Sequence, residues 1–212
     1  MTVLVIETST RRPSLALAWN SEVRDELIWE TEDLAINLLG KLETLLERNH
    51  IDITTVSRIA ICLGPGSWTG VRVGLSFAKG LVCGQRQRLY GFFSVESLMF
   101  ACRKETGPVC CLVNAYRGRF YYYLRKKPAV LVRSPSIKTG TIREILSFLP
   151  PGTLLTGPGL EDIPESMVKE YRDLRVAERP RWYPLAGEAA RLLFHKTGRK
   201  LPSPPLEPFY GR

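Results

Sequence analysis

The sequence predicts a two-lobed α/β protein with mixed β-sheets flanked by helices and a shortened second lobe. Apolar, β-rich runs alternate with stretches of helical periodicity along the 212 residues, which is typical of α/β folds. A charged turn at residues 103–108 separates two such series. We therefore expect an N-terminal lobe over residues 1–102 and a smaller C-terminal lobe, with a terminal helix and a tail, over residues 103–212.

The first lobe is expected to open with an antiparallel meander. Strands are predicted at residues 2–7, 14–19 and 23–29 because apolar residues there are separated by polar turns. Thr31 or Asp33 then caps a helix that runs to about Arg48. The residues of this helix at core spacing are Leu38, Leu39, Leu42, Leu45 and Leu46. A strand at 88–93 and a helix from residue 94 complete this lobe.

A glycine-rich loop joins the strand ending at Leu63 to a helix capped by Ser67 or Thr69. Gly70 and Gly74 lie on one stripe of this helix, so another backbone can approach closely. The adjoining stripes are apolar, which predicts burial on more than one side. The loop lacks the Lys-Ser/Thr of a P-loop and the G-x-G-x-x-G and G-x-S-x-G patterns, which favours a structural turn over direct phosphate binding.

The second lobe is predicted to contain several short strands around one helix. Strands are expected at 109–114, 119–125, 129–133 and 153–156, and helices at 142–148 and 185–196. The segment 164–184 is expected to be irregular and basic. Alternation along a strand favours a core position for some of the tyrosines at 121–123, with base stacking as the alternative.

Composition argues for a globular cytoplasmic protein without a metal site. The chain is 44% apolar and 24% charged, and it begins without a signal-peptide pattern or a membrane segment. Five cysteines without C-x-x-C spacing and two histidines, expected on the surface, predict neither a disulfide framework nor a metal site. The net charge of +9 is compatible with an RNA-facing surface or with an ordinary solvated one, because the basic residues form no single arm.

Three segments resemble the TsaB (YeaZ) family of tRNA threonylcarbamoyladenosine biosynthesis proteins. Residues 64–74, G-P-G-S-W-T-G-V-R-V-G, resemble its G-P-G-S-F-T-G-[LV]-R-[IV]-G segment, and residues 206–212 resemble its E-P-x-Y-x-R ending. Residues 113–121 resemble its I-D-A-R-x-G-E-V-Y segment, with Asn114 in place of aspartate. The resemblance implies the glycoprotease-like group of the actin-like (ASKHA, ribonuclease H-like) superfamily.

Proteins of that superfamily begin with an acid and a hydroxyl-rich hairpin that cups nucleotide phosphates. At this place the chain has Glu7, Thr8, Ser9 and Thr10, where the acid is usually aspartate, and we interpret them as a vestigial phosphate loop. Because Asn114 neither ionises nor accepts a proton at neutral pH, no pair of aspartates remains for magnesium. We predict no catalytic residue and no required cofactor, and leave weak nucleotide binding open.

The resemblance implies a non-catalytic partner, or scaffold, of TsaD, which transfers the threonylcarbamoyl group to adenosine 37 of ANN-decoding tRNAs. The ATPase TsaE would be a second partner, tRNA would bind through the complex, and homodimerisation is left open. Two alternatives are a metal-dependent small-molecule kinase or glycoprotease-like hydrolase, and a stand-alone RNA-binding protein.

The TsaD interface is expected on the two first-lobe helices, as the resemblance implies. Leu34-Ala35-Ile36 replaces a polar H-S-E type segment of the family, which hints at partner burial or tighter packing there. The predicted interface residues are Leu34, Ile36, Leu38, Gly70, Val73, Gly74, Phe77 and Leu81.

Overall fold

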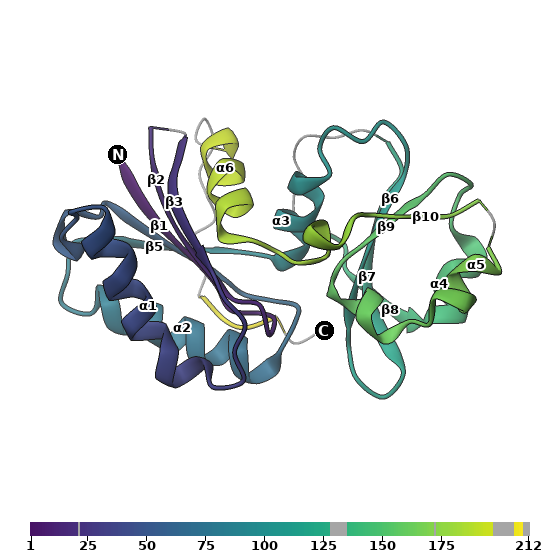
Figure 1. The fold of residues 1–212 in the computed structure, drawn as a ribbon, viewed down its shortest axis with the longest axis horizontal. Helices are drawn as coiled ribbons and strands as arrows, with labels where there is room; N and C mark the ends of the chain where they lie inside the picture. The colour runs from purple at the N-terminus through teal and green to yellow at the C-terminus, as the bar shows by residue number, and fades with distance from the viewer. Residues whose placement is uncertain (21, 128–134, 172, 197–205, 210–212) are drawn as a thin grey trace.

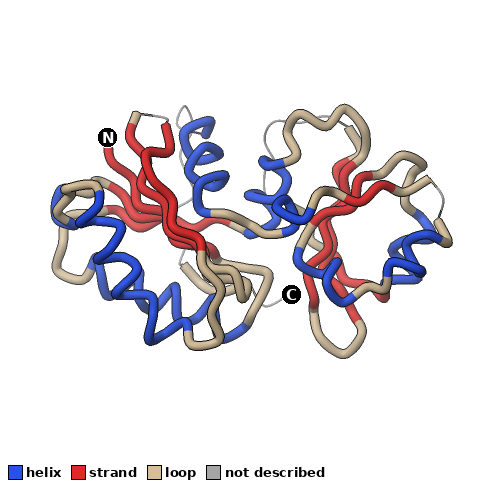
Figure 2. Tube along the Cα trace, in the orientation of Figure 1, coloured by secondary structure: helices blue, strands red, loops and turns tan. Residues whose placement is uncertain are grey.

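The computed structural model has two lobes, each built on a five-stranded mixed sheet flanked by helices (Figure 1; Figure 2). It describes residues 1–20, 22–127, 135–171, 173–196 and 206–209. The predicted two-lobed α/β architecture is therefore confirmed.

The first lobe carries a sheet with strand order β3-β2-β1-β4-β5. Its first three strands form the predicted antiparallel meander, and β4 and β5 run parallel to β1. The elements are β1 (Thr2–Glu7), β2 (Ser14–Trp19), β3 (Glu22–Ile28), α1 (Leu34–Arg48), η1 (Ile53–Thr55), β4 (Arg58–Cys62), α2 (Trp68–Val82) and β5 (Arg88–Phe92). The next helix, α3 (Ser94–Ala101), was expected to complete this lobe but packs against the second sheet. Parallel strands require crossover connections, and α1 and α2 supply them.

Both faces of this sheet are buried. Alternate residues of β1 point to opposite faces, so Leu4 and Ile6 pack in the cluster that contains α1 and α2, while Val3 and Val5 pack in another. All six residues of β1 are buried, as expected of a central strand covered on both sides.

The second lobe carries a sheet with strand order β10-β9-β6-β7-β8. One face packs with α4, α5 and η2, and the other with α3 (Figure 1). The elements are β6 (Val109–Asn114), β7 (Arg119–Arg125), β8 (Lys138–Thr141), α4 (Ile142–Phe148), β9 (Leu154–Thr156), η2 (Pro158–Asp162), α5 (Glu165–Lys169), β10 (Arg175–Val176) and η3 (Arg179–Trp182). The β6–β7 hairpin, α4 and β9 confirm the prediction.

One prediction for the second lobe is wrong, and another falls on residues that the structure does not describe. The segment 164–184 is not irregular, because it contains α5, the two-residue strand β10 and η3. These elements are too short for a periodic pattern, and β10 forms only because it pairs with β9. The predicted strand at 129–133 lies outside the described residues.

The three consecutive tyrosines of β7 alternate between the two faces of the second sheet. Tyr121 and Tyr123 pack against the cluster on the α3 side, and Tyr122 packs against the cluster on the α4 side. All three are half-buried, which agrees with the predicted core role for part of this segment.

The terminal helix α6 (Ala186–Lys196) belongs to the first lobe, which corrects the predicted boundary. It covers the sheet face opposite α1 and α2 (Figure 1), where Ala186, Ala189 and Ala190 are fully buried. The backbone N–H of Ala186 donates to Ser14 Oγ at 2.8 Å, and that of Gly187 donates to Glu26 Oε1 at 2.7 Å. The alanine face of α6 thus packs against the first sheet and completes the hydrophobic core of the first lobe.

Candidate partner interface and interlobe cleft

The glycine-rich loop at residues 63–67 is held against the turn between β1 and β2. The backbone N–H of Ser67 donates to Ser9 O at 2.6 Å, and a Cβ on Gly66 would lie 2.2 Å from the same oxygen. Ser67 is the N-cap of α2, as predicted, and its Oγ accepts from the N–H of Gly70 at 3.1 Å. Glycine is required at residue 66 because no side chain fits between these two backbones.

The small stripe of α2 faces the interior of its own lobe, which corrects part of the predicted partner interface. A Cβ on Gly70 would lie 2.1 Å from Thr8 O, and one on Gly74 would lie 2.1 Å from Thr8 Oγ1 and 3.1 Å from Ile61 Cδ1. Leu38 is 1% exposed in the core beneath α1. These three predicted residues cannot line a partner surface because this lobe already encloses them.

The outer side of α1 and α2 nevertheless exposes apolar side chains. Ile36 is 79% exposed and Leu39 is 52% exposed, both on α1, and Trp68 at the start of α2 is 50% exposed. The other predicted interface residues are half-buried at the edge of the core: Leu34, Val73, Phe77 and Leu81. Trp68 was not predicted as an interface residue. Leu39 was expected in the core because it lies at helical spacing from Leu42 and Leu46, and its exposure corrects that prediction.

We call this outer surface the α1–α2 face and define it by Ile36, Leu39, Val73, Phe77 and Trp68. The two helices lie side by side below the first sheet (Figure 1). Single exposed apolar residues are ordinary, but an isoleucine exposed by 79% beside an exposed leucine on one helix is a typical feature of an interaction surface.

The predicted phosphate loop is buried beneath the glycine-rich loop and α2. Glu7, Thr8 and Ser9 are at most 1% exposed, and Glu7 Oε1 accepts from the N–H of Ser9 at 2.7 Å. Burial raises the pKa of the Glu7 carboxyl from 4.5 to about 7. Glu7 Oε2, Thr8 Oγ1 and Ser9 Oγ have no hydrogen-bond partner within the described chain. These groups lie under the lobe's own backbone and do not form a cradle open to the cleft.

Thr10 and Asn114 are each engaged in local hydrogen bonds. Thr10 Oγ1 accepts from the N–H of Arg12 at 3.1 Å. Asn114 Nδ2 donates to Asp162 Oδ2 at 2.7 Å, and its Oδ1 accepts from the N–H of Tyr116 at 2.6 Å. The sequence reasoning missed Asp162 because 48 residues separate it from Asn114.

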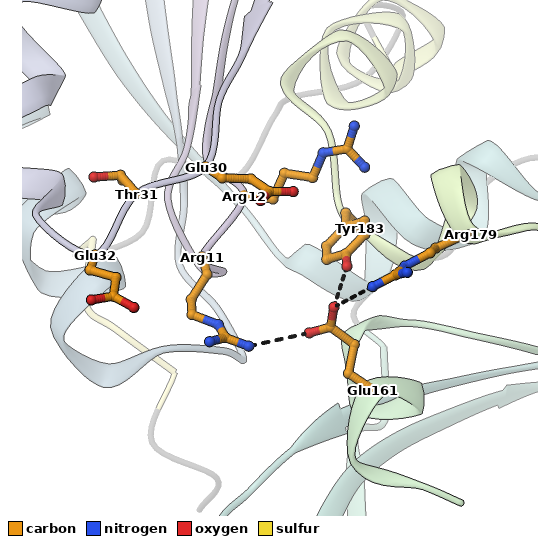
Figure 3. A pocket seen from close by; sticks show the side chains of 8 residues that line it. All are labelled: Arg11, Arg12, Glu30, Thr31, Glu32, Glu161, Arg179 and Tyr183. Carbon is orange, nitrogen blue, oxygen red and sulfur yellow. Dashed lines mark hydrogen bonds and ion pairs between the residues drawn. The ribbon is translucent and has the colours of Figure 1, made fainter. Parts of the chain in front are cut away.

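A polar pocket of about 440 Å³ lies between the two lobes (Figure 3). It is lined by residues of the β1–β2 turn, the segment before α1, and the region of η2 and η3. These residues are Arg11, Arg12, Glu30, Thr31, Glu32, Glu161, Arg179 and Tyr183. None of them was predicted as a site residue, because they come from both lobes and are distant in the sequence.

Glu161 is the centre of this pocket (Figure 3). Its carboxylate lies 4.0 Å from Arg11 Nη2 and 3.9 Å from Arg179 Nη2, and it accepts a hydrogen bond from the Tyr183 hydroxyl. Partial burial, together with this carboxylate, raises the pKa of the Tyr183 hydroxyl. Arg12 lies over the Tyr183 ring at 5.1 Å. The pocket thus joins the lobes through balanced charges, and exposed ion pairs of this kind are worth at most about 1 kcal/mol each.

The described part of the chain has two further negative features. No described helix is long and apolar enough to cross a membrane. No group of three or more His, Cys, Asp or Glu residues among those described is placed to hold a metal ion.

The two-lobed arrangement is shared with solved structures that have an actin-like fold. The structure of a ROK hexokinase from Thermus thermophilus matches with a TM-score of 0.52 at 11% identity, covering 92% of this chain and 99% of that one. YeaZ from Pseudomonas aeruginosa matches with a TM-score of 0.74 at 20% identity, covering 99% of each chain. At these identities the likeness defines the class of fold, which is actin-like, with a cleft between two mixed α/β lobes.

Sequence comparisons show which proteins within that class the chain resembles. The family model described as TsaD, tRNA N6-adenosine threonylcarbamoyltransferase, matches residues 31–135. The protein named tRNA threonylcarbamoyladenosine biosynthesis protein TsaB is 30% identical over 122 residues in Bacillus subtilis and 26% identical over 124 residues in Escherichia coli. The chain is therefore similar to proteins of the TsaB family.

These two alignments cover about half of each protein. They span 57% and 58% of this chain, and 53% and 54% of the Bacillus subtilis and Escherichia coli relatives. The names of both relatives refer to tRNA threonylcarbamoyladenosine biosynthesis.

Proposed function

We propose that this chain is a non-catalytic partner of a TsaD-like protein in threonylcarbamoyl transfer to adenosine 37 of ANN-decoding tRNAs. The α1–α2 face is the observation that carries the proposal. It presents Ile36 and Leu39 to solvent on a helix whose opposite side is already fully packed. The names of the relatives support the tRNA modification, and the match of the TsaD family model to residues 31–135 supports a partner of related fold.

Burial of this face would contribute substantially to association. Complete burial of an isoleucine or leucine side chain contributes about 1.5–3 kcal/mol, so Ile36 and Leu39 alone would supply a few kcal/mol. Helix pairs pack by inserting side chains of one helix between those of the other, and two adjacent helices offer the ridges for such packing. We therefore assign the partner interface to the α1–α2 face and leave Gly70, Gly74 and Leu38 in the lobe's own core.

The absence of chemistry in this chain is part of the proposal. The carboxyl of Glu7 is buried beneath the glycine-rich loop and is not presented to a substrate. The side-chain amide of Asn114 is hydrogen-bonded to Asp162 and does not ionise at neutral pH. Two arginines of the interlobe pocket, Arg11 and Arg179, share the Glu161 carboxylate. This arrangement favours a scaffold over the alternative of a metal-dependent kinase or hydrolase, and we propose that the subunit requires no cofactor of its own.

The proposed complex has further members. We propose a TsaE-like ATPase as its second protein partner and tRNA as the substrate, within the cytoplasm. A second copy of this chain is the competing occupant of the α1–α2 face, and the oligomeric state of the isolated chain distinguishes a homodimer from the heterodimer. A stand-alone RNA-binding function would require tight tRNA binding without any protein partner.

Reconstitution of the modification tests the proposal. The purified chain, a TsaD-like protein, a TsaE-like ATPase and tRNA are combined with a threonylcarbamoyl donor, and modified adenosine is measured by mass spectrometry of digested tRNA. We expect product only when this chain is present, and wild-type product levels with Glu7→Gln or Asn114→Ala. Loss of product with either variant in an intact complex would show that the chain contributes chemistry. Product formation without the chain would overturn the proposal.

A further inference from the structure

Nearly all of the excess positive charge of this chain comes from one stretch of the second lobe. Residues 106–143 contain eight Lys and Arg residues and no Asp or Glu. The other 22 Lys and Arg residues nearly balance the 21 acidic residues, although the net charge of the chain is +9. The basic residues alone are dispersed along the sequence, but the charge that remains after balancing is concentrated in this stretch, which includes β7, β8 and the start of α4.

A pocket of about 520 Å³ lies in this stretch, beside β7, β8 and the end of α4. We call it the β7–β8 pocket and define it by Tyr122, Lys126, Lys138 and Phe148, which are among its lining residues. Its lining contains no acidic side chain among the described residues. The pocket is therefore both aromatic and cationic.

The aromatic side chains of the β7–β8 pocket are available to a ligand. Phe148, in the last turn of α4, is 49% exposed, and its ring centroid lies 5.6 Å from that of the half-buried Tyr122 at an interplanar angle of 50°. Tyr122 and Lys138 are register partners across β7 and β8, so both side chains lie on the same face of the sheet. The strand register therefore places Lys138 beside the aromatic pair of Tyr122 and Phe148.

Two acidic residues that adjoin this stretch have partners outside the β7–β8 pocket. Glu144 follows the stretch directly, but its carboxylate accepts from the N–H of Thr141 at 2.8 Å and so caps α4. Glu170 Oε2 lies 3.9 Å from Arg143 Nη1, so these two side chains form an ion pair. In the interlobe pocket, by contrast, Arg11 and Arg179 are both within 4.0 Å of Glu161. The charge complementarity to a polyanion is therefore greater at the β7–β8 pocket than in the cleft.

We propose that the β7–β8 pocket binds an unpaired nucleotide of tRNA, an inference that rests on the proposed function for its choice of RNA. The base lies against Phe148 and Tyr122, and Lys126 and Lys138 contact the flanking phosphates. Proteins commonly bind unpaired RNA in this way, because every base has a face that stacks on an aromatic ring and every phosphate attracts a cation. An acidic peptide would use the lysines but would gain less from the aromatic pair.

Fluorescence anisotropy of labelled tRNA, titrated with the complex of this chain and its TsaD-like partner, tests the assignment. One variant carries Lys126→Glu and Lys138→Glu, and a second carries Phe148→Ala. The matched control carries Arg86→Glu and Arg88→Glu, which change the net charge equally at two exposed positions of the first lobe. Thermal melting establishes that each variant is folded before binding is compared.

The two pocket variants have different expected signatures. The double lysine variant should weaken tRNA binding by about tenfold or more and reduce the slope of log affinity against log salt by about 1 to 2. Phe148→Ala should weaken binding by about five- to hundredfold while leaving that slope unchanged. The control should bind within about threefold of wild type, because any general attraction of a polyanion falls off within a Debye length.

Three results would overturn the inference. If both pocket variants bound tRNA with wild-type affinity, the pocket would not be a tRNA site. If the control variant lost as much tRNA affinity as the double lysine variant, the effect would come from net charge alone. Binding of polyglutamate as tight as that of tRNA, with the same sensitivity to Phe148→Ala, would assign the pocket to an acidic protein. Co-elution separates this inference from the proposed function: if the wild-type chain fails to co-elute with the TsaD-like protein, the proposed function fails, and the titration is repeated with the chain alone.

Discussion

Replacing Glu7 by glutamine should make the protein more stable at pH 8 but not near pH 4.5. In the folded chain the pKa of Glu7 is raised from 4.5 to about 7 by burial. Below pH 4.5 both folded and unfolded chains hold the proton, so there is no penalty. Between pH 4.5 and about pH 7, Glu7 ionises in the unfolded chain but stays protonated in the folded chain, so the free energy of unfolding falls as the pH rises. Above about pH 7 the carboxyl is ionised in both states, and the loss of stability is constant.

The size of this effect follows from the shift. A change of about 2.5 pKa units corresponds to about 3 kcal/mol of unfolding free energy at pH 8. Glutamine keeps a carbonyl oxygen for the N–H of Ser9 but carries no charge to desolvate. For a chain of this length, about 3 kcal/mol corresponds to a rise of about 6–12 °C in the melting temperature.

Thermal melting of wild type and Glu7→Gln at pH 4.5 and pH 8 measures the effect. Glu22→Gln, an exposed position on the same sheet, controls for the loss of one negative charge. We expect a gain for Glu7→Gln at pH 8 that disappears at pH 4.5, with little change for the control at either pH. An equal difference between Glu7→Gln and wild type at both pH values would refute the reasoning, because it would show that the carboxyl does not titrate between them.

Two further predictions concern packing. Gly74→Ala should destabilise the isolated chain by about 1–3 kcal/mol in thermal or urea unfolding, because the new Cβ would lie 2.1 Å from Thr8 Oγ1. Adding Thr8→Ala should recover part of the loss, and no recovery would argue against this contact. Arg125→Met should reduce the unfolding free energy by about 1–3 kcal/mol for each of the two carbonyls, of Cys102 and Glu105, to which Arg125 donates at 3.1 Å. Urea unfolding unchanged from wild type would contradict this second account.

Local signals in the sequence were sufficient for most elements of the fold. Ser67 predicted the start of α2 because a hydroxyl followed by a helical pattern is a strong capping signal, and the structure places it at the N-cap. The apolar rows of α1 likewise predicted Leu42 and Leu45 in the core. Such features depend on residues within one or two turns, so sequence periodicity is enough to find them.

The errors arose where distant segments meet. The small stripe of α2 was correctly expected to admit a close neighbour, but the pattern could not show that this neighbour is Thr8 of the same lobe. The return of α6 to the first sheet depends on contacts with Ser14 and Glu26, more than 160 residues earlier. The interlobe pocket and the β7–β8 pocket are likewise assembled from segments that no local pattern connects.

The affinity of this chain for its TsaD-like partner, measured by calorimetry with Ile36→Asp and Ile28→Asp, tests the central claim most directly. Ile36 is 79% exposed on the α1–α2 face, and Ile28 is 39% exposed on β3, so the same substitution is made inside and outside the proposed interface. We predict that Ile36→Asp keeps its melting temperature but binds about ten- to hundredfold more weakly, since it loses about 1.5–3 kcal/mol of apolar burial, while Ile28→Asp binds like wild type. Wild-type affinity in a folded Ile36→Asp variant would contradict the account.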